Sequence, residues 1–208
     1  IKAHYVIVAT GPRSSLVPDS MTPDDRDMLI GYEETTHVRE RREFDLTIWF
    51  SKFASGGYVW DFADTGDLRR IGLGFPITNR ENPVTNLHKF LDMHPELKGK
   101  VDHTIAHQIP AGPPPRTVVD GNIMYAGDAA STCQADTGGG LQTAFWSGAM
   151  AARSIVHGDA IFYQDFWNTE MRPYLMRHYK IKKAMYRIGT EKLGVLMDAM
   201  STYKIKSE

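Results

Sequence analysis

The sequence has little of several features that mark specialised classes of protein. Its 208 residues include one cysteine, Cys133, so neither an intrachain disulfide nor a zinc site built on cysteine pairs can form. Lys+Arg and Asp+Glu number 24 and 25, and a net charge of −1 argues against nucleic-acid binding driven by overall charge. No apolar run approaches the roughly 20 residues of a membrane-spanning helix. We therefore expect a cytoplasmic chain that binds no nucleic acid.

Strand patterns dominate the first half of the chain. The β-branched run over residues 5–9 ends at Thr10-Gly11-Pro12, which is typical of a buried parallel strand and its turn. Antiparallel strands are predicted over 31–38, 46–50, 57–62, 69–75 and 101–109. Asn82-Pro83 supplies a helix start, and Pro95 limits the helix that follows.

The second half alternates a hairpin with helices. Residues 118–119 and 123–126 flank Asp120-Gly121, which predicts two paired strands. A helix follows Gly138-Gly139-Gly140, and its small and apolar positions (Leu141, Ala144, Phe145, Gly148, Ala149 and Ala152) are predicted to form its packing face. Helices are predicted from about residue 160, with a break at Pro173.

The strongest chemical signal is an acidic residue at the end of a strand, followed by a run of glycines at the start of a helix. Gly127-Asp128 ends the second hairpin strand, and Gly138-Gly139-Gly140-Leu141 opens the next helix. A glycine-lined helix N-terminus suits an anion or an electron-rich ring edge, and a nearby carboxylate suits a sugar hydroxyl. A flavin needs both features. A turn-capping aspartate beside a flexible loop is the alternative reading of the same residues.

The string from Tyr125 to Ala130, together with Thr137 to Leu141, resembles the second flavin motif of the aromatic hydroxylase superfamily, and its three glycines resemble the geranylgeranyl reductases within it. Residues 6–14 resemble the strand and turn that return to the FAD domain, and Tyr58-Val59-Trp60-Asp61-Phe62 resembles the substrate-sheet signature. The resemblance implies cofactor contacts at Thr10, Gly11, Gly127, Asp128, Gly138, Gly139, Gly140 and Leu141.

The resemblance also implies a fold and an order of segments. The fold is mixed α/β, with the end of a Rossmann-like FAD domain and an antiparallel substrate sheet. Residues 1–17 and 113–158 would belong to the FAD domain, 18–112 to the substrate domain, and 159–208 to a helical end. The G-x-G-x-x-G fingerprint for the ADP half of FAD is absent from the chain, so we expect an N-terminal half that this sequence lacks.

By the same resemblance, the protein is an FAD-dependent oxidoreductase that saturates double bonds of a geranylgeranyl or polyprenyl chain on a diphosphate or glycerolipid. NAD(P)H or another reductant would supply the electrons. No catalytic proton donor can be named from the sequence. A flavin monooxygenase or halogenase on the same scaffold is the enzymatic alternative, and a non-catalytic lipid- or partner-binding module is the alternative of another class.

Tyr58, Trp60 and Phe62 alternate along one strand, so their side chains share a face. The resemblance makes that face the wall of an isoprenoid tunnel, whereas ordinary sheet packing is the alternative. Further candidates for the same cavity are Trp49, Phe50, Phe53, Leu73 and Phe75.

Two further patterns concern metals and membranes. His103 and His107 share a strand face, but no third ligand follows at a metal-site spacing, so we predict no metal site. Residues Arg172 to Lys192 include seven basic side chains and one acidic one. This segment is a candidate for peripheral contact with an anionic lipid surface, or else a solvated helix face.

Overall fold

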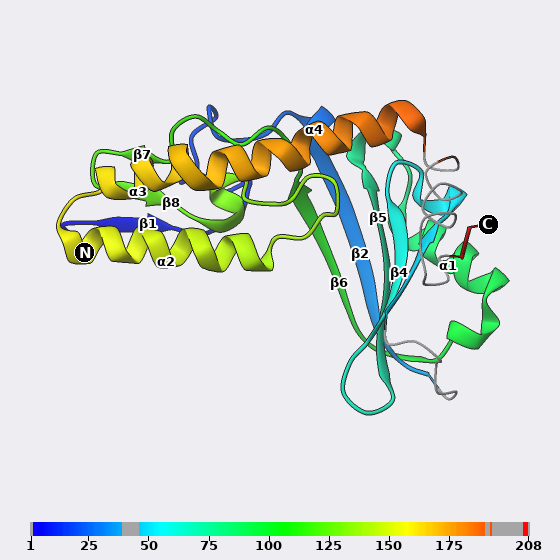
Figure 1. The fold of residues 1–208 in the computed structure, drawn as a ribbon. Helices are drawn as coiled ribbons and strands as arrows, with labels where there is room; N and C mark the ends of the chain where they lie inside the picture. Colours follow the sequence, from blue (N-terminus) through cyan, green and yellow to red (C-terminus); the bar gives the residue numbers. More distant parts are fainter. Residues whose placement is uncertain (1, 39–45, 190–191, 193–205, 208) are drawn as a thin grey trace. The chain divides into compact units, whose positions relative to one another are not determined.

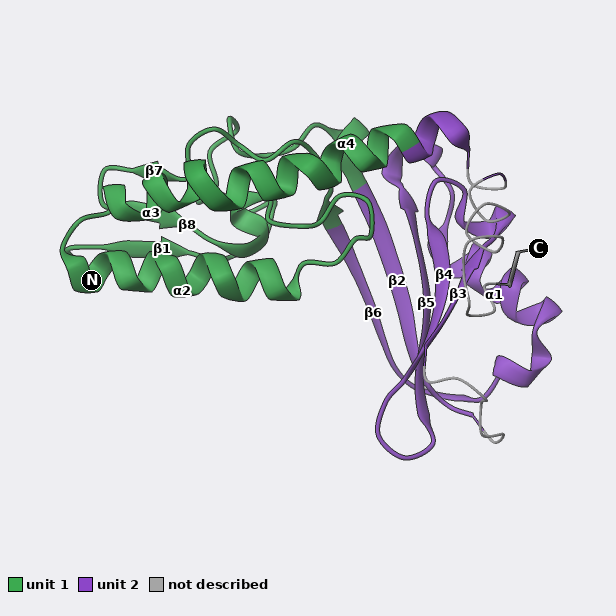
Figure 2. Ribbon diagram, viewed as in Figure 1, with its two compact units in different colours: residues 1–28, 109–184 green, residues 29–108, 185–208 purple. Residues whose placement is uncertain are grey.

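The computed structural model of the chain describes residues 2–38, 46–189, 192 and 206–207. It divides into two compact units, coloured in Figure 2. Unit 1 contains residues 1–28 and 109–184, and unit 2 contains residues 29–108 and 185–208. Both helices and sheets are present (Figure 1), which confirms the predicted mixed α/β class. The finer division into an FAD domain, a substrate domain and a helical end stays a prediction.

Unit 1 is built on a three-stranded sheet in the order β1-β8-β7. Strand β1 (Val6–Val8) pairs in parallel with β8 (Ile123–Tyr125), which forms a hairpin with β7 (Val119–Asp120). The parallel strand and the hairpin were both predicted from the sequence. The register pairs Val8 with Tyr125, so the chain leaves β1 and β8 at the same edge of the sheet.

Three helices complete unit 1, namely α2 (Leu141–His157), α3 (Ile161–Phe166) and α4 (Arg172–Ile188). Only the last four residues of α4, Met185 to Ile188, belong to unit 2. Tyr163 and Trp167 are fully buried in the core of the unit. The Tyr163 hydroxyl donates to the carbonyl of Tyr125 at 2.8 Å, and Trp167 Nε1 donates to the carbonyl of Pro115 at 2.9 Å. These bonds connect the helices to strand β8 and to the segment around Pro115.

The predicted break at Pro173 is wrong. The chain stays helical through this proline because a π-helical turn over Trp167–Met171 precedes α4. A proline inside an α-helix removes one backbone donor and crowds the carbonyl four residues earlier. The wider turn accommodates the missing hydrogen bond just before the proline.

The predicted packing face of α2 is also wrong, although the helix itself is confirmed. The structure buries Thr143, Ser147, Ala151 and Ser154, whereas Leu141 and Phe145 are 74% and 72% exposed. The three hydroxyls donate to helix carbonyls three or four residues earlier, at 2.9 to 3.2 Å. Since each hydroxyl donates its proton to a carbonyl of the same segment, these small polar residues can be buried.

Unit 2 is built on an antiparallel sheet in the order β6-β2-β5-β4-β3, with the short β9 (Lys206–Ser207) at the edge beside β3. Its main strands are β2 (Met28–His37), β3 (Leu46–Phe50), β4 (Tyr58–Ala63), β5 (Leu68–Pro76) and β6 (Lys100–Pro110). All five were predicted. The first residue of β2 and the last two of β6 belong to unit 1.

One face of this sheet is covered by α1 (Pro83–Met93), whose N-cap is Asn82, as predicted. The core between them includes Trp49, Val59, Ile71, Leu73 and Phe75 from the strands, and Leu87, Phe90 and Leu91 from the helix. Trp49 packs edge-on against Phe90, with ring centroids 5.4 Å apart. The opposite face of the sheet carries the side chains that alternate with these.

Candidate functional site

The turn after β8 and the turn after β1 lie at one edge of the unit 1 sheet, because the two strands are parallel and in register. Thr10 and Gly11 follow the first strand, and Gly127 and Asp128 follow the second. The carboxyl edge of parallel strands is where α/β folds commonly bind ligands. The structure therefore brings together at one edge the two turns that the sequence separates by more than a hundred residues.

Glycine is required at the turn after β8. Gly127 adopts a φ of +61°, a conformation that other residues rarely take, and an added Cβ would lie 3.6 Å from the Cβ of Ala144 in α2. The Gly127 amide donates to the Ser147 hydroxyl at 3.0 Å. The turn is therefore held close to α2, and this contact fixes the position of Asp128, the next residue in the chain.

Asp128 lies beside the N-terminus of α2. A Cβ added to Gly140, the N-cap residue, would stand 3.8 Å from Asp128 Oδ1. Gly140 has no side chain with which to cap this helix start. The amides of Gly138 and Gly139 have partners inside the loop, namely the Gln134 carbonyl at 2.8 Å and Thr137 Oγ1 at 3.2 Å. The amides that begin at Gly140 are therefore the ones placed to meet an anion or a ring edge next to the carboxylate.

Helix α4 anchors the loop that carries these glycines. Gln134 Nε2 donates to the hydroxyl of Tyr174 at 2.7 Å, and His178 Nδ1 lies 2.8 Å from Asp136 Oδ1. The side chains of Asp136 and His178 are 9% and 19% exposed, so this pair is largely removed from water. Sequence reasoning missed both anchors, and no sequence signal could have found them, because the partners lie about forty residues apart without a shared motif.

Cys133 lies in the same loop and is buried. Burial raises the pKa of its thiol far above the ordinary value, and the negative charge of Asp128 raises it further. The thiol therefore stays protonated at neutral pH, which makes it a poor nucleophile. Its packing contribution is the role that the geometry supports.

In unit 2, Tyr58, Trp60 and Phe62 lie on the sheet face opposite α1, and their rings form a row. Neighbouring ring centroids are 5.8 and 6.2 Å apart. Trp60 lies over two glycines of β5, since a Cβ at Gly72 would stand 2.5 Å from Trp60 Cζ2. Its Nε1 donates to Glu33 Oε2 at 2.9 Å. The glycines and the glutamate fix the ring flat against the sheet and leave an aromatic surface above it.

The expectation that Trp49, Leu73 and Phe75 line the same cavity is wrong. The register pairs Trp49 with Val59 and Leu73 with Val59, and all of these residues belong to the core under α1. Side chains of neighbouring paired residues share a face, so these positions cannot join the row of Trp60.

Within the described ranges, no group of three or more His, Cys, Asp and Glu side chains is arranged to hold a metal ion. Over the same part of the chain, no helix has the length and apolar character needed to cross a membrane.

No protein-family model matches the sequence. The digeranylgeranylglycerophospholipid reductase of Methanococcus aeolicus is 28% identical over 96% of this chain and 55% of the relative. A geranylgeranyl bacteriochlorophyll reductase-like protein from Thermoplasma acidophilum has the same fold, with a TM-score of 0.87, 22% identity, and coverage of 98% of this chain and 56% of that one. In sequence, the chain is similar to digeranylgeranylglycerophospholipid reductases. It spans about half the length of the curated relatives it matches.

The fold is shared more widely than the sequence. A probable FAD-dependent monooxygenase from Pseudomonas aeruginosa matches 91% of this chain with a TM-score of 0.59 and 14% identity. The similarity to the digeranylgeranylglycerophospholipid reductases is one of sequence, whereas the likeness to the two solved structures concerns the fold alone. The roles of the individual site residues remain predictions.

Proposed function

We propose that this chain forms the flavin-ring and substrate side of an FAD-dependent reductase that saturates double bonds in geranylgeranyl or related polyprenyl chains. The observation that carries the proposal is the position of Asp128 beside the glycine-lined N-terminus of α2, at the carboxyl edge of the parallel strands. The relationship to digeranylgeranylglycerophospholipid reductases supports the lipid as the substrate class.

The residues at this edge fit the isoalloxazine and ribityl part of FAD. In the proposal, the Asp128 carboxylate accepts a hydrogen bond from a ribityl hydroxyl, and the amides from Gly140 and Leu141 face the electron-rich edge of the ring. Thr10 and Gly11 approach from the neighbouring turn, while Gly138 and Gly139 shape the loop. When bound, FAD would supply the hydride for alkene reduction. The contribution of the chain is to hold the ring and to favour negative charge on it.

The row formed by Tyr58, Trp60 and Phe62 is the proposed contact for the isoprenoid chain. An unactivated alkene must be held in place for reduction, and a rigid aromatic surface can supply that positioning. The tight seating of Trp60 on Gly72 supports this role, since a fixed ring loses little freedom when a ligand binds. NAD(P)H is the proposed electron donor.

The polar face of α4 is the proposed contact with a lipid surface. Lys180, Lys183 and Arg187 are exposed on this helix, and exposed basic residues attract anionic headgroups. Lys182 cannot take part, because it is 3% exposed and its Nζ donates to the Ala111 carbonyl at 2.9 Å. The membrane contact would therefore be weak and peripheral.

The visible absorption spectrum of the longest product of the gene, purified without added cofactor and then denatured, tests the flavin part of the proposal. We expect the flavin bands in the native protein and the release of FAD on denaturation. The reduced protein is then mixed with a geranylgeranyl glycerolipid under anaerobic conditions, and we expect flavin reoxidation with a gain of two hydrogens per saturated bond.

Each alternative has its own signature in the same experiment. Reoxidation that requires oxygen, with oxygen or halogen incorporated into an aromatic substrate, would replace the reductase by a monooxygenase or halogenase. A colourless product that also refuses added FAD, yet binds lipid tightly, would replace it by a non-catalytic binding module.

A further inference from the structure

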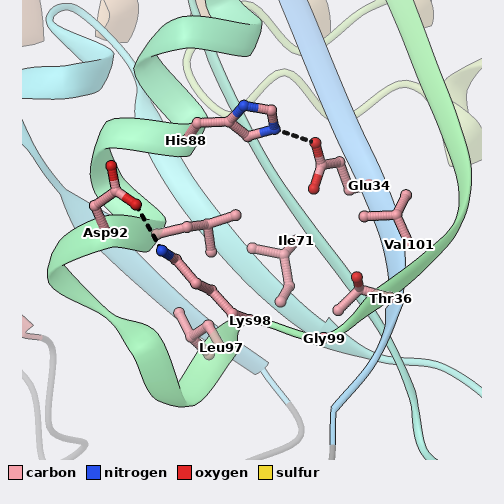
Figure 3. Close-up of a pocket in the computed structure, with 10 residues that line it drawn as sticks. Glu34, Thr36, Ile71, His88, Asp92, Leu97, Lys98, Gly99 and Val101 are labelled. Carbon is pink, nitrogen blue, oxygen red and sulfur yellow. Dashed lines mark hydrogen bonds and ion pairs between the residues drawn. The ribbon is translucent and has the colours of Figure 1, made fainter.

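A pocket of about 480 Å³ opens in unit 2, on the sheet face covered by α1 and so opposite to Trp60 (Figure 3). Its volume lies within the usual range of about 300 to 1,000 Å³ for small-molecule sites. Its apolar walls come from Ile71, Leu91 and Leu97. Nothing in the proposed flavin function uses this pocket, because every residue that lines it lies away from the row of Tyr58, Trp60 and Phe62.

A buried carboxylate marks one end of the pocket. The side chain of Glu34 is 6% exposed, and its Oε1 accepts from the hydroxyl of Tyr32 at 2.9 Å and lies 2.8 Å from His88 Nε2. Burial, followed by the hydrogen bond to Glu34, raises the pKa of Tyr32 to about 12, so the phenol keeps its proton and donates at neutral pH. Both contacts use the same carboxylate oxygen, and together they fix the orientation of the group.

The second carboxylate oxygen of Glu34 points into the pocket, towards Ile71 and the hydroxyl of Thr36 (Figure 3). At the other end, Lys98 Nζ donates to Asp92 Oδ1 at 2.6 Å. The cation of Lys98 is therefore engaged at the rim and is held away from Glu34. An incoming group at the buried end would meet two oxygen acceptors and a negative charge, with apolar side chains behind them.

We propose that this pocket binds a small primary ammonium compound with a short apolar body, whose ammonium group donates to Glu34 and Thr36. A primary ammonium has three donors and a positive charge, which match one carboxylate oxygen and one hydroxyl. An anion would face the buried Glu34 carboxylate at close range. A quaternary ammonium has no N–H and would leave both acceptors without a hydrogen bond.

The test is a titration of the full 208-residue chain, labelled with ¹⁵N, with n-butylammonium chloride. We expect saturable amide shift changes confined to β2, α1 and residues 97–101. Butyltrimethylammonium, n-butanol and butyrate at matched ionic strength serve as comparison probes. Each should bind at least about tenfold more weakly, because a charge-assisted hydrogen bond contributes roughly twice as much as a neutral one.

Two variants and a control locate the site. Glu34→Gln should weaken n-butylammonium binding about tenfold or more, whereas Asp64→Asn, which removes a carboxylate from the turn between β4 and β5, should leave it unchanged. Val101→Phe fills the entrance from a position that is 42% exposed and should abolish binding even if Glu34→Gln does not fold. Unchanged binding by either folded pocket variant, or tighter binding of butyrate, would overturn the proposal.

Discussion

The two units offer a ligand different kinds of surface. In unit 1 the candidate site lies where strands end, and it is made of turns, glycines and helix amides around Asp128. In unit 2 the candidate surfaces are sheet faces made of side chains, with aromatic rings on one face and the pocket of Glu34 on the other. Backbone amides suit a ring edge or an anion whose position must be exact, whereas side chains on a sheet suit a longer apolar ligand.

Within unit 2, two tryptophans illustrate the difference between a core residue and a surface residue. Trp49 is 1% exposed and packs under α1, whereas Trp60 lies on the opposite face with one side of its ring against glycine. Substitution of Trp49 should destabilise the fold, whereas substitution of Trp60 should weaken binding of the isoprenoid chain. Four predictions follow from these differences, in order of expected effect.

Trp49→Ala should lower the free energy of unfolding by about 4 kcal/mol, because it leaves a large cavity in the core under α1. Trp60→Ala should lower it by only about 1 kcal/mol, as for a partly exposed residue, yet weaken the binding of long isoprenoid lipids more than that of FAD. Urea denaturation and lipid titration of the two variants measure these effects. Equal losses of fold and flavin in Trp60→Ala would assign Trp60 to the core.

Gly72→Ala should destabilise the protein by about 3 kcal/mol, because the new methyl group would overlap the Trp60 ring and the Tyr32 carbonyl. Gly74→Ala is the matched control on the same strand, where an added Cβ meets its nearest atom at an ordinary 3.5 Å. Thermal unfolding of the two variants gives the comparison. A mild effect at both positions would show that the Trp60 ring is free to move aside.

Asp128→Ala in the complete reductase should raise the Kd for FAD about tenfold, since it removes the charged acceptor proposed for the ribityl chain. Asp120→Ala, in the exposed hairpin of the same sheet, is the control and should leave the Kd unchanged. Quenching of flavin fluorescence on binding measures both. Unchanged affinity in Asp128→Ala would remove the residue from the cofactor site.

Lys183→Gln should weaken binding to vesicles that contain anionic lipid about fivefold, from about 1 kcal/mol per basic residue near the surface. Lys89→Gln, exposed on α1, is the control for general charge. Co-sedimentation at two salt concentrations gives the readout. Equal binding by the two variants, or binding that does not respond to salt, would leave α4 as a solvated helix.

The sequence by itself determined the strands of both sheets, the hairpin at Asp120-Gly121, and the starts of α1 and α2, because alternation, turn residues and caps act over a few neighbouring positions. It also pointed to Gly127, Asp128 and the three glycines, since that motif lies within one stretch of chain. Two predictions about the helices, made from the sequence, were wrong. The buried face of α2 and the passage through Pro173 both depend on contacts or turns that hydrophobic spacing does not encode.

Only the tertiary structure decided which distant residues meet. The parallel pairing of β1 with β8 brings Gly11 and Asp128 to one edge, and α4 brings Tyr174 and His178 onto the glycine loop. Likewise, the pocket of Glu34 exists because α1 and residues 97–101 close over strands that are distant in sequence. Local patterns specify elements, but a site is a set of distances between elements, and packing of the whole chain sets those distances.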